Sequence, residues 1–354
     1  MTDTVASVDG TPRTLGVELR VREVRHETSE SVSITFDATP ASHSSLRFRP
    51  GQFLTLRIPS DRTGSVARCY SLASAPSNNE HLRIAVKRTV DGYGSNWLCD
   101  NVSVGMTLRV LPPAGRFTVD EPDSDLLLFA AGSGITPMLS IVKTALRNSP
   151  VTVYLYYANR DDASVIFAEE IASLVDEYPE RLVVEHWLED AAGLPTASSI
   201  ESFAARAEAS TQAMICGPAP FMSLASQTLS ALGGLTIRTE EFVSIDGDPF
   251  VLDAQIDAAD AADTSTVQVH LDGVETSVRW PADVVLLDAL LAAGLDAPYS
   301  CREGECGSCM CLLRSGEVTR GVTDALDDDD VEEGFILACQ ATDPRGEVSV
   351  DFDA

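Results

Sequence analysis

The run Asp125-Leu-Leu-Leu-Phe-Ala-Ala131, followed directly by Gly132-Ser-Gly134-Ile-Thr136-Pro137, decides how the middle of this 354-residue chain folds. The first part is a nearly continuous apolar strand, which is typical of a parallel sheet buried on both faces. Proline suits the first turn of a helix, where its missing N–H costs little. Apolar residues then continue at helical spacing to Leu146. A glycine-rich turn between strand and helix lets a pyrophosphate approach the positive helix N-terminus. This stretch therefore predicts a nucleotide site that includes Gly132, Thr136 and Pro137.

Downstream of this turn, strand-like and helical stretches alternate. The strand-like runs cover residues 151–157, 181–187, 213–216 and 236–242. Such alternation predicts a doubly wound α/β domain, which we place at residues 123–244. Cys216-Gly217-Pro218 follows one of these strands, and ligands of such sheets bind beyond the carboxyl ends of the strands. The turn is thus a second candidate for nucleotide binding, although Cys216 taken alone would be interpreted as a buried core thiol.

Upstream of the turn, residues 14–120 consist of short strands separated by proline and glycine. The strand-like runs cover residues 15–21, 32–36, 52–58, 81–87 and 106–111. Many short strands with turn signals between them predict an antiparallel barrel. Beyond the α/β domain, residues 245–264 are rich in Asp and Ala without clear periodicity, and we interpret them as a linker. A third domain is predicted at residues 265–354, with a hairpin at Asp272-Gly273 and a helix over residues 284–293.

This third domain contains Cys301-Arg-Glu-Gly-Glu-Cys306-Gly-Ser-Cys309, and Cys339 follows much later. The spacing C-x4-C-x2-C with a distant fourth cysteine is that of the ligands of a [2Fe–2S] cluster. A structural zinc site usually has two short C-x2-4-C pairs, which this loop lacks. Gly304 and Gly307 allow the backbone to turn around a cluster. Cys311 exceeds the four ligands required, and we interpret it as a core residue.

Composition excludes several classes of function. The formal charge of −29 argues against nucleic acid, because phosphates require clustered Lys and Arg. An acidic surface also disfavours anionic membranes, whereas it suits a protein partner with a basic face; solubility explains the charge equally well. No apolar run approaches the roughly 20 residues that span a bilayer, and the N-terminus lacks a signal pattern. A cytoplasmic location is expected. The five histidines, at positions 26, 43, 81, 186 and 270, show no metal or triad spacing, and we interpret all five as structural or solvent-facing. The run Asp327–Asp330 is interpreted as a solvated loop or helix start.

Four motifs, taken in order, resemble those of the ferredoxin–NADP reductase superfamily. They are Arg68-Cys-Tyr70-Ser71, Gly92-Tyr-Gly-Ser95, Gly132-Ser-Gly-Ile-Thr136-Pro137 and Cys216-Gly-Pro218. The cysteine-rich region resembles a plant-type ferredoxin domain. The resemblance covers nearly the whole chain. It implies a multidomain protein with an antiparallel β-barrel for FAD, a doubly wound α/β domain for NAD and an α+β β-grasp ferredoxin-like domain. Cys301, Cys306, Cys309 and Cys339 would hold the [2Fe–2S] cluster.

The same resemblance assigns roles to residues of the barrel. Arg68 would neutralise the FAD pyrophosphate, which suits the two-pronged guanidinium group. Tyr70 would stack on the isoalloxazine ring, and Ser71 would form a hydrogen bond near its reactive nitrogen. The remaining contacts would come from Val86 and Lys87 along the flavin and from Gly92 and Ser95 at the pyrophosphate.

Residues of the α/β domain would complete the nicotinamide site. Thr136 and Cys216 would flank the nicotinamide, and Gly217 and Pro218 of the same turn would also bind the cofactor. Phe242 would cover the flavin until nicotinamide displaces it; simple core packing is the alternative for Phe242. Asn159 and Arg160 would meet the adenosine ribose. An acidic residue at the ribose favours NAD and an arginine favours NADP, and Asp161 and Asp162 follow Arg160 directly, so the residues alone leave both cofactors open.

The resemblance implies an electron-transfer reductase that moves electrons from a nicotinamide dinucleotide through FAD and one cluster to a separate oxygenase. Three stretches, Arg62-Thr-Gly-Ser-Val-Ala-Arg68, Ser95-Asn-Trp-Leu-Cys99 and Tyr157-Ala-Asn-Arg-Asp-Asp162, resemble the reductase components of 3-ketosteroid 9α-hydroxylases. That likeness implies NADH and a Rieske-type oxygenase partner in steroid degradation. The reductase of phenylacetyl-CoA epoxidase, or of another aromatic oxygenase, is the alternative. A non-catalytic redox-sensing or regulatory subunit is the alternative of a different class.

Overall fold

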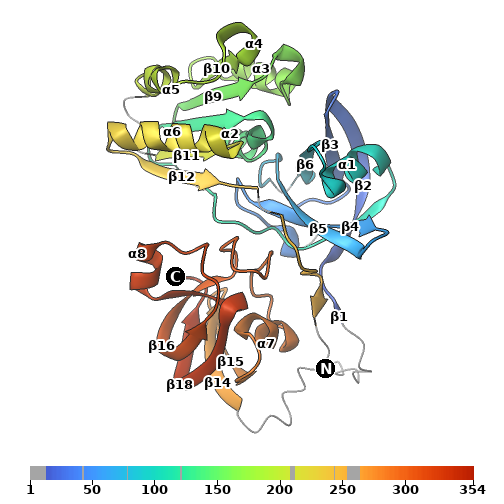
Figure 1. Ribbon diagram of the computed structural model, residues 1–354, viewed down its shortest axis with the longest axis vertical. Coiled ribbons are helices and arrows are strands. Elements are labelled where there is room, and N and C mark those ends of the chain that lie inside the picture. Colours follow the sequence, from blue (N-terminus) through green and yellow to red (C-terminus); the bar gives the residue numbers. More distant parts are fainter. Residues whose placement is uncertain are drawn as a thin grey trace. The chain divides into compact units, whose positions relative to one another are not determined.

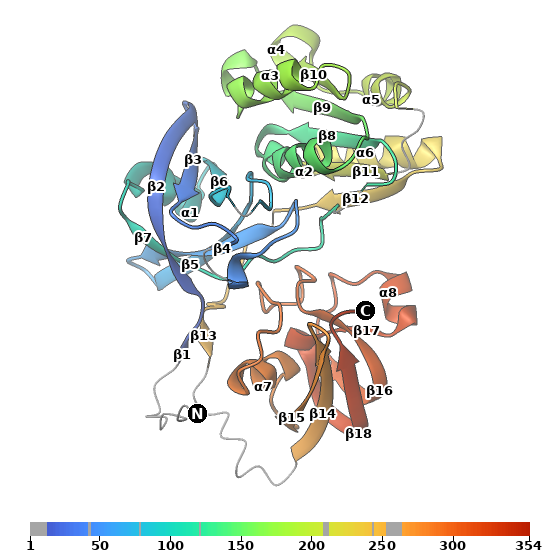
Figure 2. The ribbon, with the colours of Figure 1, turned by 180° about the vertical axis from the view of Figure 1, so that it is seen from behind.

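The computed structural model describes residues 13–41, 44–77, 79–119, 122–207, 212–242, 244–252 and 264–354. Figure 1 shows its ribbon, and Figure 2 shows it from behind. The chain forms two compact units. One unit comprises Glu18–Ile58 and Arg68–Ser244, and the other comprises Pro59–Ala67 and Ile245–Ala354 with the chain up to Val17. Within these described ranges, none of the helices has the length and apolar character that crossing a bilayer requires.

The first domain is the predicted antiparallel barrel (Figure 1). Its six strands have the order β5-β4-β7-β2-β3-β6. Their bounds are β2 (Val17–Thr28), β3 (Ser31–Phe36), β4 (Phe53–Ser60), β5 (Gly64–Ser71), β6 (Arg83–Lys87) and β7 (Thr107–Val110). The sheet closes where Leu72, just after β5, pairs with Ile84 of β6. A 3₁₀ turn, η1 (Ser44–Leu46), precedes β4, and helix α1 (Tyr93–Asn101) lies between β6 and β7.

The second domain is the predicted doubly wound α/β domain, with five parallel strands in the order β10-β9-β8-β11-β12. The strands are β8 (Leu126–Ala131), β9 (Val153–Asn159), β10 (Leu182–Leu188), β11 (Gln212–Cys216) and β12 (Thr236–Glu240). The helices are α2 (Ile135–Asn148), α3 (Ala168–Glu177), α4 (Glu189–Ala192), α5 (Ala197–Ala204) and α6 (Ala219–Leu232), with short 3₁₀ turns η2 (Gly132–Gly134) and η3 (Asp162–Ser164). The order reverses between β8 and β11, which makes this the switch point where ligands bind in such sheets.

Strand β8 lies between two separate apolar cores, and all six of its residues are buried. Leu126, Leu128 and Ala130 face one core, together with α2 and α3. The alternate residues of β8 face the other core, together with α5 and α6. This arrangement explains why the strand is apolar at every position rather than at every second one.

One strand of this domain is shorter than predicted. The sequence predicts a strand over residues 236–242, but β12 ends at Glu240. The reason is its partner: β12 pairs with β11 only, and the last pair joins Cys216 to Glu240 before β11 turns away at Gly217. Phe242 therefore lies beyond the sheet, and 44% of its surface is exposed. Core packing, which was the alternative interpretation of Phe242, is wrong.

The barrel and the α/β domain belong to one unit and are joined by polar contacts that the sequence does not reveal. Arg83 of β6 donates to both carboxylate oxygens of Glu170 in α3, at 2.6 and 2.8 Å. Lys143 of α2, nearly fully buried, lies 3.4 Å from the same carboxylate. The buried Ser140 Oγ donates to the carbonyl oxygen of Ser74 at 2.7 Å. A charge-assisted network of this kind fixes one domain on the other more firmly than neutral bonds would.

The third domain has a five-stranded mixed sheet with the order β15-β14-β18-β16-β17. Strands β14 (Thr264–Leu271) and β18 (Ala341–Asp351) are parallel, and the others, β15 (Val274–Pro281), β16 (Met310–Arg320) and β17 (Phe335–Leu337), pair antiparallel. Helices α7 (Leu286–Ala292) and α8 (Asp328–Glu333) and the 3₁₀ turn η4 (Ala338–Gln340) complete the domain. The predicted hairpin turn at Asp272-Gly273 is present, and both of its residues have positive φ, as a tight turn of this kind requires.

Part of the predicted linker is ordered, and part lies outside the described residues. Strand β13 (Val251–Leu252) pairs with β1 (Arg13–Thr14), whereas residues 253–263 are not described. The acidic run is the start of helix α8, as one of its two interpretations predicts. Asp327 is the N-cap, and its side chain accepts a hydrogen bond from the backbone N–H of Asp330. No residue of α8 is buried, which agrees with a solvated segment. His43 also lies outside the described residues.

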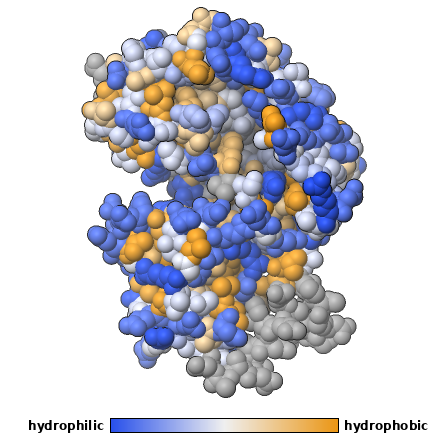
Figure 3. All heavy atoms as spheres, viewed as in Figure 1, coloured by the Kyte–Doolittle hydropathy of each residue, from blue (hydrophilic) through white to orange (hydrophobic). Residues whose placement is uncertain are grey.

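Figure 3 shows one face of the molecule coloured by hydropathy. Hydrophilic residues cover much of this face of the third domain, and apolar residues are scattered among them. A hydrophilic face is expected of a chain in which 22% of the residues are charged.

Candidate cofactor sites

The four cysteines predicted as cluster ligands lie together in the third domain. Cys301, Cys306 and Cys309 occupy the irregular loop between α7 and β16, and Cys339 lies in η4. They are associated in two pairs: the backbone N–H of Cys301 donates to Cys306 Sγ, and that of Cys339 donates to Cys309 Sγ, each at 3.5 Å. A [2Fe–2S] cluster takes two protein ligands on each iron, so two pairs of sulfurs fit this group. The buried Cys311 lies in β16, where it pairs with Ile336, and its core role is as predicted.

The backbone of the cysteine loop is shaped for these sulfurs. Gly304 and Gly307 have φ of +87° and +66°, values that favour glycine. A Cβ at Gly304 would also lie 2.6 Å from the carbonyl oxygen of Val322. Backbone N–H groups point at the thiols, for example Glu303 N at 3.4 Å from Cys301 Sγ. Such N–H groups stabilise the negative charge of thiolate and sulfide, which is how proteins tune these clusters.

Two side chains within the loop make contacts that the cysteine spacing does not predict. The Glu303 carboxylate accepts a hydrogen bond from the backbone N–H of Gly247 at 2.6 Å. Arg302 donates to the carbonyl oxygen of Val251 at 2.6 Å and forms an ion pair with Asp288 of α7. The loop residues that are not ligands thus hold the segment that follows the α/β domain.

The residues predicted to bind the FAD pyrophosphate come together in the barrel. Arg68 lies on β5, and its Cγ is so close to the first turn of α1 that a Cβ on Gly94 would lie 2.9 Å away. Gly92 is the N-cap residue of α1, and the buried Ser95 accepts a hydrogen bond from the backbone N–H of Thr89. A guanidinium beside a helix N-terminus has the charge that an anionic group requires.

The residues predicted at the flavin ring also lie at the end of β5 and on β6. Ser71 is 3% exposed, and its hydroxyl has no hydrogen-bond partner among the described residues. Buried hydroxyls are nearly always bonded, so this orphan group fits a ligand such as the flavin ring. Burial raises the pKa of the Tyr70 phenol, which stays neutral. The Val86 side chain is fully buried, and Lys87 is half-buried.

The two predicted nucleotide turns meet at the switch point of the parallel sheet. Gly132 and Gly134 follow β8, and Gly217 follows the neighbouring β11. A Cβ at Gly134 would lie 2.1 Å from the carbonyl oxygen of Cys216, so only glycine allows the two turns to touch. Cys216 is fully buried at the end of β11. The Thr136 hydroxyl donates to the carbonyl oxygen of Ser133 at 2.8 Å, which holds the glycine turn in shape.

The ribose residues predicted from the sequence lie at the end of β9. Asn159 is 9% exposed, and its amide nitrogen has no hydrogen-bond partner among the described residues, which fits a ligand hydroxyl. Arg160 follows and forms an ion pair with Glu30 of the barrel. Lys87 lies nearby: its Nζ would be 3.3 Å from a Cβ added at Gly132. Burial is the main cause that lowers the pKa of Lys87, and Arg160 lowers it further.

One group at the nicotinamide end was not predicted from the sequence. Glu240, the last residue of β12, is directly opposite Cys216 in the sheet. Desolvation raises the pKa of Glu240 to about 8. Desolvation also raises the pKa of the Cys216 thiol, and the charge of the neighbouring Glu240 raises it further. The only feature of the sequence that could have indicated Glu240 is its place at the carboxyl end of a strand, two residues before Phe242.

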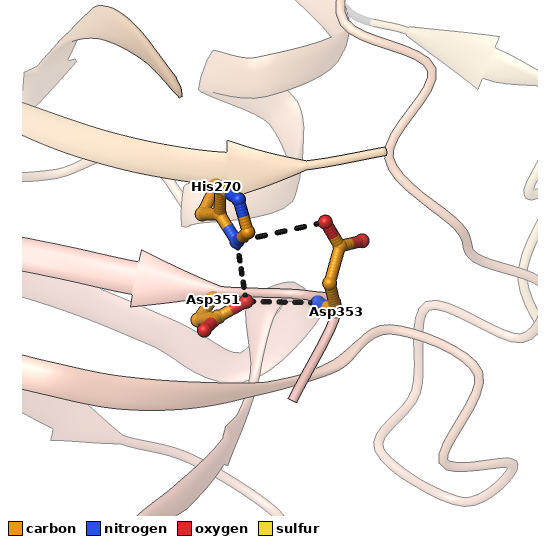
Figure 4. Close-up of side chains that lie close together, drawn as sticks. All are labelled: His270, Asp351 and Asp353. Atoms are coloured by element: carbon orange, nitrogen blue, oxygen red, sulfur yellow. Dashed lines mark hydrogen bonds and ion pairs between the residues drawn. The ribbon is translucent and has the colours of Figure 1, made fainter. Parts of the chain in front are cut away.

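His270, Asp351 and Asp353 form a second cluster of possible ligands in the third domain (Figure 4). His270 Nδ1 lies 3.0 Å from Asp351 Oδ1 and 3.5 Å from Asp353 Oδ2. Arg314 already pairs with Asp351, and Asp353 accepts the backbone N–H groups of the Asp272-Gly273 turn. Each member of the cluster thus has protein partners, so we interpret the cluster as a structural contact that holds the C-terminal residues on the β14–β15 hairpin. This agrees with the structural role predicted for His270.

The fold and these sites define an oxidoreductase that combines a flavin site, a nicotinamide dinucleotide site and a plant-type iron–sulfur site in one chain. Comparison with protein families confirms the three parts. Residues 19–119 match the oxidoreductase FAD-binding domain, residues 128–227 the oxidoreductase NAD-binding domain and residues 269–342 the 2Fe-2S iron–sulfur cluster binding domain.

Known relatives align with this chain over nearly its whole length. The chain is 51% identical over 340 residues to the ferredoxin reductase component of 3-ketosteroid-9-alpha-monooxygenase from Rhodococcus rhodochrous, covering 95% of this chain and 97% of the relative. It is 35% identical over 353 residues to one of the subunits of 1,2-phenylacetyl-CoA epoxidase from Escherichia coli, with 95% and 97% covered. The crystal structure of phthalate dioxygenase reductase aligns with a TM-score of 0.55 at 26% identity, covering 95% of this chain and 98% of that one. The chain belongs to this family of flavin and iron–sulfur reductase components, and it is an electron-transfer oxidoreductase.

Proposed function

We propose that this chain is the reductase component of a two-component oxygenase that 9α-hydroxylates 3-ketosteroids, and that it delivers electrons from NADH to a Rieske-type oxygenase. The observation that carries the proposal is the 51% identity, over 95% of the chain, to a reductase of that name. The chain needs no steroid site of its own, because the oxygenase binds the steroid. We place the protein in the cytoplasm, since four of its eight cysteines form the cluster site and none of the eight is in a disulfide.

The order of the three domains matches the chemistry that their cofactors supply. Nicotinamide gives up electrons in pairs, an iron–sulfur cluster accepts them one at a time, and a flavin can do both. The protein's task is therefore to bind, orient and shield these groups. None of the residues assigned to this task has to act as a general acid or base.

Residues at the end of β5 and at the switch point would carry out the orientation. Arg68 and the N-terminus of α1 would hold the FAD pyrophosphate, Tyr70 would stack on the ring, and the orphan hydroxyl of Ser71 would donate to it. Thr136 shapes the glycine turn, and Cys216 would flank the nicotinamide. Phe242, which is exposed beyond β12, is free to cover the flavin and to move aside when nicotinamide enters.

The charges near Arg160 favour NADH. Arg160 is paired with Glu30, and Asp161 and Asp162 follow it. One carboxylate engages this guanidinium and two more follow it in the chain, which disfavours the 2′-phosphate of NADPH, whereas a carboxylate suits a ribose hydroxyl.

An anaerobic titration of the purified protein, monitored by visible absorbance, tests the proposal. We expect NADH to bleach both flavin and [2Fe–2S] bands, with NADPH far less effective. The reduced protein should then transfer electrons to a Rieske-type 3-ketosteroid oxygenase, measured as NADH-dependent 9α-hydroxylation. A protein that stays colourless after cofactor reconstitution would contradict the proposal. Stable partner binding without rapid reduction of any acceptor would favour a regulatory subunit.

A second candidate acceptor is the di-iron oxygenase of phenylacetyl-CoA epoxidase. The 35% identity to a component of that enzyme favours it. The same titrated protein distinguishes the two: electron delivery to the epoxidase, without delivery to the steroid oxygenase, would move the chain to the second pathway while the reductase activity stands.

A further inference from the structure

Glu30 lies in the two-residue turn between β2 and β3 of the flavin-binding barrel, where Thr28 pairs with Ser31. The turn is held firmly at Glu30, whose carbonyl oxygen accepts the backbone N–H of Arg88 at 2.8 Å. The backbone N–H of Glu30 donates to the hydroxyl of Thr28 at 3.1 Å. The carboxylate is therefore presented from a fixed backbone.

Arg160 is fixed just as firmly on the other side. It follows β9 in the α/β domain, and its carbonyl oxygen accepts the backbone N–H of Asp190 at 2.9 Å. The Arg160 guanidinium and the Glu30 carboxylate form an ion pair between the two domains. Both side chains are partly exposed, 57% for Arg160 and 44% for Glu30, so a ligand can reach them.

The ion pair lies at the end of the sheet where the dinucleotide binds. Asn159, with its orphan amide nitrogen, directly precedes Arg160. Lys87 lies against the Gly132 turn, and the charges of Arg160, Glu30 and Asp161 all influence its pKa. The pair is therefore on the path from the pyrophosphate turn to the ribose, and its guanidinium is the one that could meet a 2′-phosphate.

We propose that Glu30, a residue of the flavin-binding barrel, is a specificity-determining residue for the dinucleotide: it engages Arg160 and so withholds this guanidinium from the 2′-phosphate of NADPH. The proposal deepens the proposed function and rests on it. Charge supports it as well, because Glu30, Asp161 and Asp162 outnumber Arg160 and Lys87. The carboxylates repel the 2′-phosphate of NADPH, and Glu30 occupies the arginine that could bind this phosphate. Both effects disfavour NADPH relative to NADH.

The test compares Glu30→Gln with wild type as holoprotein. We expect the ratio of kcat/KM for NADPH to that for NADH to rise about tenfold, because the released guanidinium can form a charge-assisted bond to the phosphate. Calorimetry with adenosine 2′,5′-bisphosphate should show about tenfold tighter binding, whereas binding of 5′-AMP should change less than about twofold. Neither probe depends on the flavin.

Two further variants make the result specific. Glu169→Gln is the matched control, because Glu169 also forms an exposed ion pair between the two domains, with Arg25 at 2.5 Å, yet lies on α3. It should leave the ratio unchanged. In an Arg160→Gln background, Glu30→Gln should have less than half of its effect, since Glu30 acts partly through Arg160.

The proposal would be overturned if Glu30→Gln left the ratio of kcat/KM for NADPH to that for NADH unchanged, or if it strengthened binding of adenosine 2′,5′-bisphosphate and 5′-AMP equally. It would also be overturned if Glu169→Gln raised the kcat/KM ratio as much as Glu30→Gln does. If NADH bleaches the wild-type flavin and Glu30→Gln changes nothing, the reductase function stands and only the role of Glu30 falls. If neither dinucleotide bleaches the wild-type flavin, the proposed function itself fails.

Discussion

Replacing Gly134 with alanine should damage the α/β domain far more than the same change at Gly132, two residues away. The Cβ at position 134 would lie 2.1 Å from the carbonyl oxygen and 2.4 Å from the carbonyl carbon of Cys216. A carbon–oxygen contact needs about 3.3 Å, so the overlap exceeds 1 Å. The obstacle is the backbone at the end of β11, the strand next to β8 in the sheet, and backbone cannot rotate away as a side chain could.

The expected cost is at the upper end of the range for overpacking, about 3 kcal/mol in the free energy of unfolding. At position 132 the nearest atom is Lys87 Nζ, 3.3 Å away at the tip of a flexible side chain. Alanine there has only to adopt φ of +53°, which costs about 1 kcal/mol. The two variants thus add the same methyl group to the same turn with different consequences.

Urea unfolding of the holoprotein, followed by tryptophan fluorescence and flavin absorbance, measures the difference. We expect Gly134→Ala to lose about 2 kcal/mol more than Gly132→Ala. It should also bind NADH more weakly, because the shifted strand carries Gly217 of the second nucleotide turn. If Gly134→Ala unfolds within about 0.5 kcal/mol of wild type, the two turns are not in rigid contact and the reasoning is refuted.

Three further changes test other parts of the molecule. The folded state retains a proton on Glu240 that the unfolded carboxyl releases near pH 4.5, so the free energy of unfolding of the wild type should fall between pH 4.5 and about 8, and Glu240→Gln should flatten this fall. An unchanged slope of the unfolding free energy against pH, measured by urea unfolding, would contradict this. His270→Ala should destabilise the protein at pH 5 to 6 but not at pH 9, since the hydrogen bond with Asp351 raises the pKa of His270 and the stabilisation disappears as His270 deprotonates; equal thermal shifts at both pH values would argue against the ion pair. Cys311→Ser should keep the [2Fe–2S] spectrum and lose about 1–2 kcal/mol of stability because a hydroxyl replaces a buried thiol, whereas Cys306→Ser should lose the spectrum; loss of the cluster in both would mean that Cys311 supports it.

The sequence was most informative where function constrains neighbouring residues. The cysteine spacing around Cys306 and the strand–turn–helix at Gly132 are local patterns, so they predicted the right elements at the right places. The burial of β8 on both faces was predicted for the same reason, because it shows in the residues of that strand alone.

The contacts that the sequence did not predict join residues far apart in the chain. Glu30 and Arg160 are 130 residues apart, and the pairing of Glu303 with Gly247 spans 56. Nothing in the residues around Glu30 marks its partner, since a lone carboxylate in a hairpin turn is usually solvated. The strand predicted to reach Phe242 was too long for a related reason: the end of β12 is set by where its neighbour β11 turns, and not by the apolar residues that follow it.

The double-sided burial of β8 also affects how this chain can diverge. Its even-numbered residues belong to one core and its odd-numbered residues to the other, so a substitution such as Leu128→Val and one such as Phe129→Leu disturb different sets of neighbours. Because the two side chains have different partners, the effects of such pairs should couple less than those of two substitutions within one core. Each core is therefore free to drift without compensating change in the other. The two cores are not independent at the Gly132–Gly134 turn, where β8 ends. A methyl group added at Gly134 would meet the backbone of β11 at Cys216.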